Sequence, residues 1–508
     1  MKQTFQICYT SDTHGHVFPV NYAAHSPEAS GLLNLACQVG KDGDTLLLDG
    51  GDSLQGTPLS QYYLDHSAAC AVHPIAAAFN ALGLDYFTLG NHDFNFGYEA
   101  LKSYLCAMNA VCLCANLQDL KGELPLRAEA VHTLASGLRV GITGVVTDHV
   151  NVWEQPQNLE HLRVTDTFQA AKAALARLRP LCEVCVCIYH GGFEKDLATG
   201  RTLSSSGENI ACKMARELNF DLLLTGHQHM AVEGVRLGGT YAAQPPAGAG
   251  QYLRVKGVYS GGACRFSSAL LPVGRRHPAQ PYQDLLGLEE KVQAWLDQPI
   301  GTLHAPIPPE EKLSSALYGS QVAALFNQVQ LAATGADFSC TSLGNAPVGL
   351  ASPVTMRGVT SAYLFSNTLV VLQVTEPVLR AALERCAAYF TLKNGRPAVS
   401  EAFLLPKIEH YNYDFFAGLA YTFDLRRPVG SRVTRLARLG GAPLGPGPFS
   451  LCTSNYRATG TGGYEALRDC PVLWRGSTEM PELVARYIQA HSPLPPLHNA
   501  DLEVVWQA

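Results

Sequence analysis

Short apolar runs alternate with amphipathic stretches along the first half of the chain. The apolar runs have the length of β-strands, and they occupy residues 4–11, 45–50, 85–90, 139–146, 182–190 and 220–226. Between several of them lie amphipathic stretches that predict helices, for example residues 73–83 and 167–181. Buried strands that alternate with helices are typical of layered α/β domains. The pattern therefore predicts an α/β fold class for this half.

The pattern changes in the second half. Residues 251–273 predict a closing β-ribbon, and residues 283–296 have helical periodicity within a Pro-containing stretch. We interpret residues 276–300 as a linker helix between a first domain of residues 1–275 and a second domain of residues 301–508. The second domain is expected to be α+β. Its expected elements are a long helix at 314–336, a strand at 367–375, a helix at 376–392, a strand at 419–425 and a Gly-rich loop at 454–465.

Composition restricts the class of partner. The 508 residues are 47% hydrophobic and 16% charged, which is a globular composition, and the formal net charge is −6. Because no basic tract stands out, a nucleic acid polymer is not expected as a partner. No stretch approaches the ~20 apolar residues of a membrane span, and the first residues lack a signal peptide's apolar core. We expect no membrane partner and a cytoplasmic protein, while an exported form with its signal removed stays open.

The cysteines support the expectation of a cytoplasmic protein. There are 15 of them, and several lie inside apolar runs. Cys182, Cys185 and Cys187 fall within one predicted strand, where they read as packing residues and not as a disulfide framework. A reducing compartment fits this usage best.

Polar side chains follow five of the predicted strands, at the point where each strand ends. They are Asp12 and His14, Asp52, Asn91 and His92, His190, and His227 and His229. Each one alone could be a turn former, a cap or a satisfied histidine. In α/β sheets, however, sites form at the carboxyl ends of the strands, so the five ends can converge on one crevice.

The types of side chain indicate a class of metal. Imidazole with carboxylate and amide oxygen, and without thiolate, suits Zn, Mn, Fe or Co. A set of this size is too large for one tetrahedral ion and suits two divalent ions. A carboxylate can bridge two such ions about 3.5–4 Å apart, and the pair can clamp a phosphate and lower the pKa of a bridging water.

The ordered motifs "DTHGH", "GGDSLQG", "GNHD", "HGG" and "GHQH" resemble those of the calcineurin-like dinuclear metallophosphatases. With the second half included, the chain looks like the 5′-nucleotidase family. The resemblance implies a four-layer α/β/β/α metallophosphatase domain followed by a nucleotide-binding domain. It implies Asp12, His14 and His229 as ligands of one metal, Asn91, His190 and His227 as ligands of the other, and Asp52 as the bridge. His92 matches the catalytic histidine, which contacts the phosphoryl oxygens and helps the leaving oxygen depart.

Within the family, stretches such as "GDSLQGTPLSQYY" and "SNYRATGTGG" look most like the bacterial 2′,3′-cyclic-nucleotide 2′-phosphodiesterase/3′-nucleotidase branch. Family 5′-nucleotidases usually carry an acid at the position of Asn95, paired with the catalytic histidine. They also usually carry an Asp at the position of Gly462, which contacts the ribose hydroxyls. Asn95 is expected to orient His92 by a hydrogen bond, and the missing Asp is consistent with a cyclic or 3′ substrate.

Aromatic residues of the second half resemble a base clamp. Tyr413 and Tyr456 match the two positions that sandwich the nucleobase in the family, although both could be core residues and Tyr411 competes with Tyr413. Gly460 and Gly462 would let the backbone approach a ligand. Asn345 and Asn367 are candidates for polar contacts, or else plain turn formers.

The resemblance implies hydrolysis of nucleotide phosphoesters with two divalent metals. The first expectation is 2′,3′-cyclic nucleotides and 3′-nucleotides as the small-molecule substrate. A 5′-nucleotidase or nucleotide-sugar hydrolase on the same scaffold is the second. A catalytically silent nucleotide-binding or sulfur-carrier-linked protein is the third. Metal identity, base preference and oligomeric state stay open.

Overall fold

The structure is a computed structural model, and it describes residues 2–203, 207–274, 283–365, 367–405, 408–445, 447–497 and 501–507. The chain divides into two compact units, Met1–Gln293 and Ala294–Ala508. This division falls inside helix α8 (Gln283–Leu296), which has the range expected for the linker helix. Residues 276–282 of the expected linker lie outside the described residues, and the expected domain boundaries stay a prediction.

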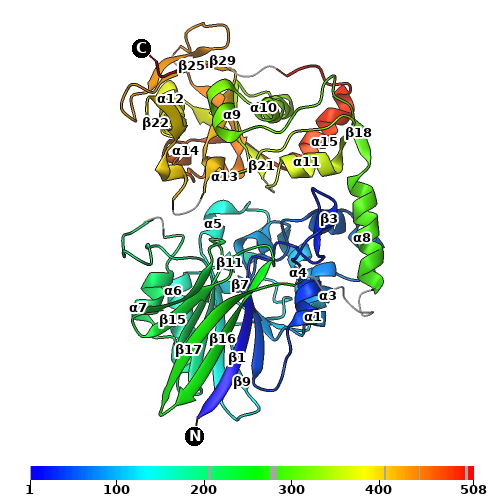
Figure 1. The fold of residues 1–508 in the computed structure, drawn as a ribbon, viewed down its shortest axis with the longest axis vertical. Coiled ribbons are helices and arrows are strands. Elements are labelled where there is room, and N and C mark those ends of the chain that lie inside the picture. The colour runs from blue at the N-terminus through cyan, green and yellow to red at the C-terminus, as the bar shows by residue number, and fades with distance from the viewer. Residues whose placement is uncertain are drawn as a thin grey trace. The chain divides into compact units, whose positions relative to one another are not determined.

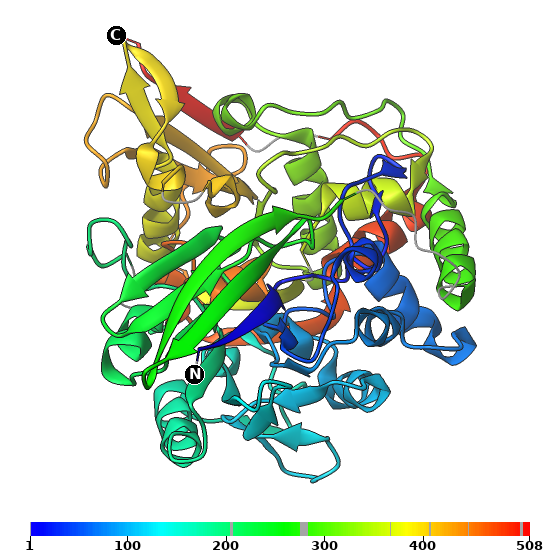
Figure 2. The same ribbon diagram turned by 60° about the horizontal axis from the view of Figure 1, so that its bottom comes forward.

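The first sheet of unit 1 has seven strands in the order β17-β16-β1-β4-β5-β6-β8. Their bounds are Ala263–Pro272, Gln251–Ser260, Gln3–Thr10, Thr45–Asp49, Tyr86–Phe87, Val111–Leu113 and Leu126–Arg127. Strand β1 pairs in parallel with β4 and antiparallel with β16, so that Ile7 lies opposite both Leu46 and Val255. Figures 1 and 2 show the long β16–β17 hairpin, in green, running beside β1, in blue. The expected β-ribbon at 251–273 is this hairpin.

The second sheet of unit 1 has six strands in the order β14-β15-β13-β12-β10-β9. Their bounds are Val232–Leu237, Thr240–Gln244, Leu222–Thr225, Val184–His190, Arg139–Val146 and Glu129–Thr133. Strands β10, β12, β13 and β15 run parallel to one another. Every residue of β12 is buried, because this strand has covered faces on both sides.

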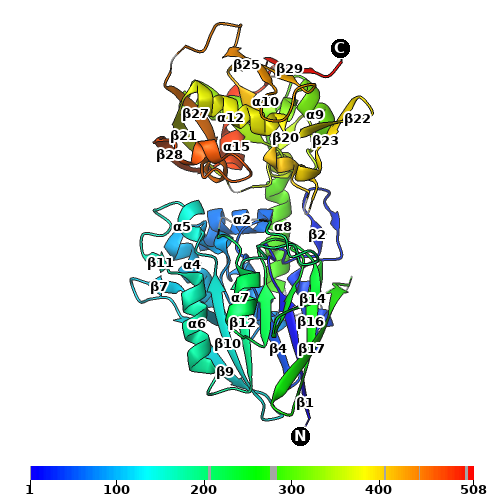
Figure 3. The same cartoon turned by 90° about the vertical axis from the view of Figure 1, so that its left-hand side faces the viewer.

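The two sheets and their helices form the predicted α/β/β/α layers. Alternate residues of a strand point to opposite faces, so Ile7 and Tyr9 of β1 enter the core between the sheets, together with Val186 of β12. Cys8 faces the other way and lies with Leu35 of helix α1 (Leu32–Gln38). On the outer face of the second sheet, helix α6 (Thr167–Leu178) packs over β10 and β12, and helix α7 (Ala211–Glu217) packs over β13 and β15 (Figure 3). Helices α3 (Pro74–Leu82) and α4 (Gly97–Ala107) follow β4 and β5 in the chain.

Unit 2 has a five-stranded sheet in the order β24-β19-β27-β21-β28 and a three-stranded sheet in the order β26-β25-β29. The bounds are Asp414–Ala417, Phe338–Ser342, Phe449–Ser454, Thr368–Val374 and Val472–Glu479, then Val433–Arg438, Leu419–Asp424 and Asp501–Val505. The helices α9 (Lys312–Tyr318), α10 (Gln321–Thr334), α11 (Met356–Ala362), α12 (Glu376–Ala387) and α15 (Met480–His491) complete it. This mixture agrees with the α+β expectation.

The smaller elements lie mostly in loops. They are β2 Val20–Asn21, β3 Ser26–Pro27, α2 Pro58–His66, β7 Leu117–Asp119, α5 Val150–Trp153, β11 Leu162–Val164, β18 Pro299–Gly301, β20 Val354–Thr355, β22 Phe390–Lys393, β23 Arg396–Val399, α13 Asn455–Ala458 and α14 Glu465–Arg468. Short 3-10 turns lie at Ser67–Ala69, Asn91–Phe94, Glu401–Phe403 and His410–Asn412.

Two helix predictions for unit 2 were wrong in extent. The long helix expected at 314–336 is divided, because Gly319 takes φ 92 and the Ser320 side chain caps α10 by accepting from the Ala323 N–H. The helix expected at 376–392 ends at Ala387, and its last expected residues form β22.

The cysteines behave as packing residues. Cys182, Cys185 and Cys187 are buried, and all fifteen cysteines, each within the described ranges, are free thiols. Across the described residues, none of the helices combines the length and the apolar character needed to cross a bilayer.

Candidate metal centre

Six predicted ligands gather in two groups in unit 1. One group is Asp12, His14 and His229, and the other is Asp52, His190 and His227. Within each group the ligand atoms all lie within 4.8 Å of one another. The side chains follow β1, β4, β12 and β13, which belong to both sheets, so the packing of the two sheets brings the strand ends together.

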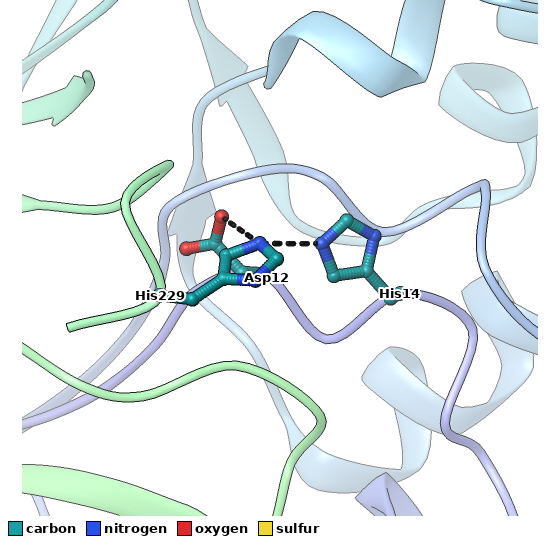
Figure 4. A group of neighbouring side chains, drawn as sticks. All are labelled: Asp12, His14 and His229. Carbon is teal, nitrogen blue, oxygen red and sulfur yellow. Dashed lines mark hydrogen bonds and ion pairs between the residues drawn. The ribbon is translucent and has the colours of Figure 1, made fainter. Parts of the chain in front are cut away.

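The first group comes from two segments that are far apart in the sequence. Figure 4 shows the His229 imidazole between the Asp12 carboxylate and the His14 ring. The His229 Nε2 atom lies 3.0 Å from His14 Nε2 and 3.5 Å from Asp12 Oδ1. The other nitrogen of His14 bonds the Gln55 carbonyl at 2.9 Å, which leaves its Nε2 directed at this group. Two imidazole nitrogens and a carboxylate oxygen aimed at one point are a suitable ligand set for a divalent cation.

The second group is more buried, and Asn91 joins it. His190 and Asp52 are almost fully buried, and His190 Nε2 lies 3.2 Å from both Asp52 Oδ2 and Asn91 Oδ1. His227 Nδ1 lies 2.8 Å from the same Asn91 oxygen. His190 Nδ1 bonds the Gly50 carbonyl at 2.6 Å, so the ring is oriented from outside the group. The amide oxygen of Asn91 thus meets a nitrogen from each of two histidines.

The charges in this group show why a cation fits. Burial opposes ionisation of Asp52, yet His190, His92 and His14 hold the pKa of this carboxyl well below its ordinary value. Burial likewise lowers the pKa of His190, but Asp52 outweighs it and raises this pKa to about 10. One proton on His190 Nε2 therefore serves two oxygen acceptors at once. A divalent ion can replace this proton and engage all three atoms, because metal binding to imidazole releases the proton.

Five of the seven predicted ligands have a left-handed backbone. The φ angles of this set are 54° for Asp12, 49° for His14, 57° for Asp52, 70° for His227 and 56° for His229. Such conformations cost a non-glycine residue on the order of 1 kcal/mol, and they concentrate at functional sites. The surrounding packing therefore holds these side chains in positions that the backbone alone would not favour.

Glycines beside the ligands allow two loops to touch. A Cβ at Gly90 would lie 2.1 Å from Asp52 Oδ1, and a Cβ at Gly51 would lie 2.2 Å from Gly90 N. The Asp93 carboxylate ties the same loops by accepting from the backbone N–H groups of Gly90, Asp52, Ser53 and Leu54 at 2.8–2.9 Å. These glycines therefore make room for the neighbouring loop.

His227 is held by a carboxylate, whereas His14 and His190 are held by backbone carbonyls, and the sequence did not suggest this partner. It faces Asn91 through Nδ1, and its Nε2 lies 2.8 Å from Glu208 Oε1. Burial raises the pKa of Glu208, but the hydrogen bond and the charge of His227, together with the charge of His149, outweigh burial and lower the net pKa. The indole of Trp153 stacks on His227 with 5.4 Å between ring centroids and 15° between planes. Glu208 lies in an irregular segment and Trp153 ends the short helix α5. Neither residue belongs to a motif, so no sequence signal pointed to them.

His92, the expected catalytic histidine, lies beside these groups. Its backbone N–H donates to Asp52 Oδ1 at 2.7 Å, and its ring centroid is 5.7 Å from that of His14. The Nδ1 atom lies 2.8 Å from Asn95 Oδ1, which is the contact expected between these two residues. Nε2 is therefore the nitrogen left for a substrate oxygen.

In unit 2 the prediction that Tyr413 stacks on a base was wrong. Its side chain is 0% exposed, its hydroxyl donates to the Ala316 carbonyl at 3.0 Å, and its ring packs against Tyr389 and Phe415. Tyr411, the competing residue, is half-buried and contacts Phe365 edge-on at 6.3 Å. A ligand can reach Tyr411 but not Tyr413.

The Gly-rich loop of unit 2 is built around a buried arginine. Arg457 pairs with both oxygens of Asp414 at 2.8 Å and donates to the Thr461 carbonyl at 2.6 Å. Beside it, Gly462 has φ 78, and a Cβ there would lie 2.2 Å from Asn412 Oδ1 and 2.4 Å from Arg457 Nη1. The loop therefore has no room for an aspartate at position 462.

The remaining candidates of unit 2 are spread over several segments. Tyr456 is half-buried in α13, and Gly460 has φ 83. The exposed Asn345 donates to the Ile408 carbonyl at 2.9 Å, and Asn367 donates to the Tyr363 hydroxyl at 3.4 Å. Their contact with a nucleotide stays a prediction.

Comparison with known proteins identifies the family. A model of the calcineurin-like phosphoesterases matches residues 5–231, and a model of the 5′-nucleotidase C-terminal domain matches residues 299–469. A Staphylococcus aureus protein assigned as a 5′-nucleotidase, solved in complex with alpha-ketoglutarate, is 30% identical. It superposes with a TM-score of 0.89 over 99% of this chain and 100% of that one. The chain is a metallophosphoesterase of the 5′-nucleotidase family. It is therefore a hydrolytic enzyme.

More distant relatives of this metallophosphoesterase are nucleotide phosphoesterases of more than one kind. The 2′,3′-cyclic-nucleotide 2′-phosphodiesterase/3′-nucleotidase of Yersinia enterocolitica is 22% identical over 96% of this chain and 85% of its own length. The trifunctional nucleotide phosphoesterase protein YfkN of Bacillus subtilis is 24% identical over 95% of this chain, which spans only 37% of that protein.

Proposed function

We propose that this metallophosphoesterase hydrolyses nucleotide phosphoesters with two divalent metal ions, and that 2′,3′-cyclic nucleotides and 3′-nucleotides are its preferred substrates. The convergence of seven ligands on two adjacent groups carries the first part of the proposal. Asp12, His14 and His229 would hold one ion, Asn91, His190 and His227 the other, and Asp52 would bridge them. Once bound, the ions would neutralise and polarise the phosphoryl group.

The protein's own residues supply the rest of the chemistry. Gln55, Gly50 and Glu208 hold the second nitrogens of three histidine ligands, so that these rings keep one orientation. His92 presents Nε2 to the phosphoryl oxygens, where a donor is worth most as charge develops in the transition state. In the imidazolium form both ring nitrogens carry a hydrogen, so Nε2 can donate to these oxygens and pass its proton to the leaving ribose oxygen while Nδ1 keeps its hydrogen on Asn95.

The Gly-rich loop supports the substrate class. In family 5′-nucleotidases an aspartate at position 462 contacts the free ribose hydroxyls, whereas here a Cβ alone would collide with Asn412 and Arg457. A ribose with phosphate on its 2′ and 3′ oxygens has no free hydroxyl pair for such an aspartate. We further propose that Tyr411 and Tyr456 contact the base, because both are half-buried while Tyr413 is not accessible.

The substrate class can be tested by direct assay. Protein stripped with EDTA and reloaded with Zn, Mn or Co is given 2′,3′-cyclic AMP, 3′-AMP and 5′-AMP. We expect the highest kcat/KM for the cyclic or 3′ substrate. A clear preference for 5′-AMP would favour the second candidate, a 5′-nucleotidase, which the 30% identity to the Staphylococcus aureus protein also supports.

The metal role can be tested in the same assay. Asp52→Asn should lower kcat by about 100-fold, because a bridging carboxylate is lost. Asp166→Asn is the matched control, since Asp166 caps α6 by accepting from Gln169 N–H and asparagine caps equally well. Full activity in Asp52→Asn would refute the proposed metal chemistry.

A further inference from the structure

A chain of hydrogen bonds runs from His92 away from the metal ligands. His92 Nδ1 lies 2.8 Å from Asn95 Oδ1, and Asn95 Nδ2 donates to Glu154 Oε2 at 2.7 Å. Glu154 follows helix α5 directly and is 59 residues from Asn95 in the sequence. The amide at position 95 thus stands between the histidine and a carboxylate from another segment.

The contacts around Glu154 fix the direction of these bonds. The backbone N–H of Gln155 donates to Glu154 Oε1 at 2.7 Å, and Asn158 Nδ2 donates to the same oxygen at 2.8 Å. A carboxylate only accepts, so the Asn95 atom facing it is the Nδ2 donor and the Asn95 oxygen faces His92. His92 Nδ1 therefore carries the hydrogen of that bond. Asn158 also donates to the Asn95 carbonyl at 2.8 Å, which holds the two segments together.

We propose that Glu154 is a positioning residue for the reaction. Acting through the Asn95 amide, it keeps His92 with Nδ1 as the donor and Nε2 directed at the substrate. The proposal rests on the proposed function of His92. It explains how this chain can have an amide at position 95, where related 5′-nucleotidases have an acid. The carboxylate is supplied by Glu154, which is connected to His92 through the Asn95 amide.

Replacing Glu154 by glutamine makes a sharp test, because it reverses the chain of hydrogen bonds. In the variant, the oxygen of the glutamine side chain would keep accepting from the Gln155 N–H and from Asn158. The NH₂ group of the same glutamine would then face Asn95 Nδ2, so that two hydrogen-bond donors would meet. The Asn95 amide must then turn over and present Nδ2 to His92 Nδ1, which can no longer carry a hydrogen. Glu154→Gln should therefore lower kcat by about 10- to 100-fold with KM changed less than about twofold.

A double substitution should restore the correct direction. In Asn95→Asp with Glu154→Gln, the new carboxylate accepts from His92 Nδ1 and from the NH₂ group of the new amide, whose oxygen still accepts from Gln155 and Asn158. Every donor again meets an acceptor, so we expect kcat to recover at least to about a third of the original value. Asn95→Asp alone places two carboxylates side by side and should be impaired. Glu160→Gln, an exposed glutamate of the same loop, is the control and should be unchanged.

A second readout does not depend on turnover. In zinc-loaded protein with ¹⁵N-labelled histidine, the His92 signals, assigned with His92→Gln, should show Nδ1 protonated in the original protein and in the double variant. Glu154→Gln should show Nδ1 unprotonated. An unchanged His92 spectrum in Glu154→Gln, kcat within twofold of the original, or no recovery in the double variant would each overturn the proposal. If the zinc-loaded protein cleaves no nucleotide, the proposed function fails instead, and the spectra still report on Glu154.

Discussion

At the scale of single residues, a left-handed backbone conformation does not by itself decide whether a side chain fits at a position. Asp12, His14 and Asp52 are predicted metal ligands and have left-handed φ angles although they carry full side chains, which is typical of functional sites. Gly462 has a similar φ of 78° but has no space for a side chain. The same backbone region therefore holds predicted metal ligands in one unit and leaves no room for an aspartate side chain in the other.

This contrast leads to a prediction on stability. Gly462→Ala should lower the free energy of unfolding by about 1–3 kcal/mol more than Gly440→Ala, because only the former adds a steric clash. Both glycines have positive φ, 78° and 84°, but a Cβ at Gly440 meets nothing within 4 Å. Urea midpoints of the two variants give the comparison. Equal losses at both positions would mean that the loop around Arg457 adapts readily.

The sequence predicted which polar side chains gather in unit 1 better than it predicted the aromatic contacts. Asp12 and Asp52 follow buried strands and His190 ends one, and strand order places strand ends together whatever the loops do. Tyr411 and Tyr413 cannot be told apart in this way. The 3-10 turn at His410–Asn412 decides which ring enters the core, and no periodicity marks such a turn.

At the scale of elements, one buried lysine connects a helix to a neighbouring loop. Lys312, the first residue of α9, is 5% exposed, and its Nζ donates to the Leu343 carbonyl at 3.0 Å, just after β19. Burial lowers the pKa of this amine to about 7, although Asp414 and Glu310 act in the opposite direction. The helix is thus held by a group whose charge changes near neutral pH.

The stability of this connection should depend on pH. The unfolded chain keeps the Lys312 proton up to about pH 10.4, while the folded chain releases it above about pH 7. Because the unfolded state binds more protons in this window, the contribution of Lys312 to stability rises with pH, by at most about 1.4 kcal/mol per pH unit. Urea midpoints at pH 7 and 9.5 should therefore diverge between the original protein and Lys312→Met. A constant difference at both pH values would show that the amine keeps its charge.

The extents of elements were predictable only where turn chemistry agreed with periodicity. The apolar pattern continues from α9 into α10, so it gives one helix, whereas Gly319 and the Ser320 cap divide the chain locally. Likewise, the apolar pattern of helix α12 continues through residues 388–392, but the helix ends at Ala387 and strand β22 follows. In both cases a local backbone choice overrides a pattern that either structure can satisfy.

At the scale of the whole molecule, both candidate metal groups found among the described residues belong to unit 1. Several of their supports come from loops distant in sequence, such as Glu208 for His227 and Gln55 for His14. These two contacts join residues that are 19 and 41 positions apart in the sequence, which is why no local pattern predicts them. Metal binding should therefore be linked to the folding of unit 1 as a body.

Removal of the metal tests this link. At a hundredfold excess over Kd, a bound ion should stabilise unit 1 by about 2.7 kcal/mol. Hydrogen exchange with EDTA or with Zn should show increased protection in peptides of β1, β12 and β13, and little change in Ala294–Ala508. Asp12→Asn should abolish most of the effect. Equal protection in both units would contradict a stabilisation confined to unit 1.

The stacking of Trp153 on His227 gives the protein an optical property. Trp153 is the one tryptophan of residues 1–293, because the other three are Trp295, Trp474 and Trp506. Its indole lies nearly parallel to a predicted ligand at 5.4 Å between centroids. With the other three replaced by phenylalanine, the emission of this one fluorophore would follow the arrival of an ion at His227. A paramagnetic ion such as Mn or Co would quench it while Zn would not, so the chain carries its own reporter of which metal it has taken up.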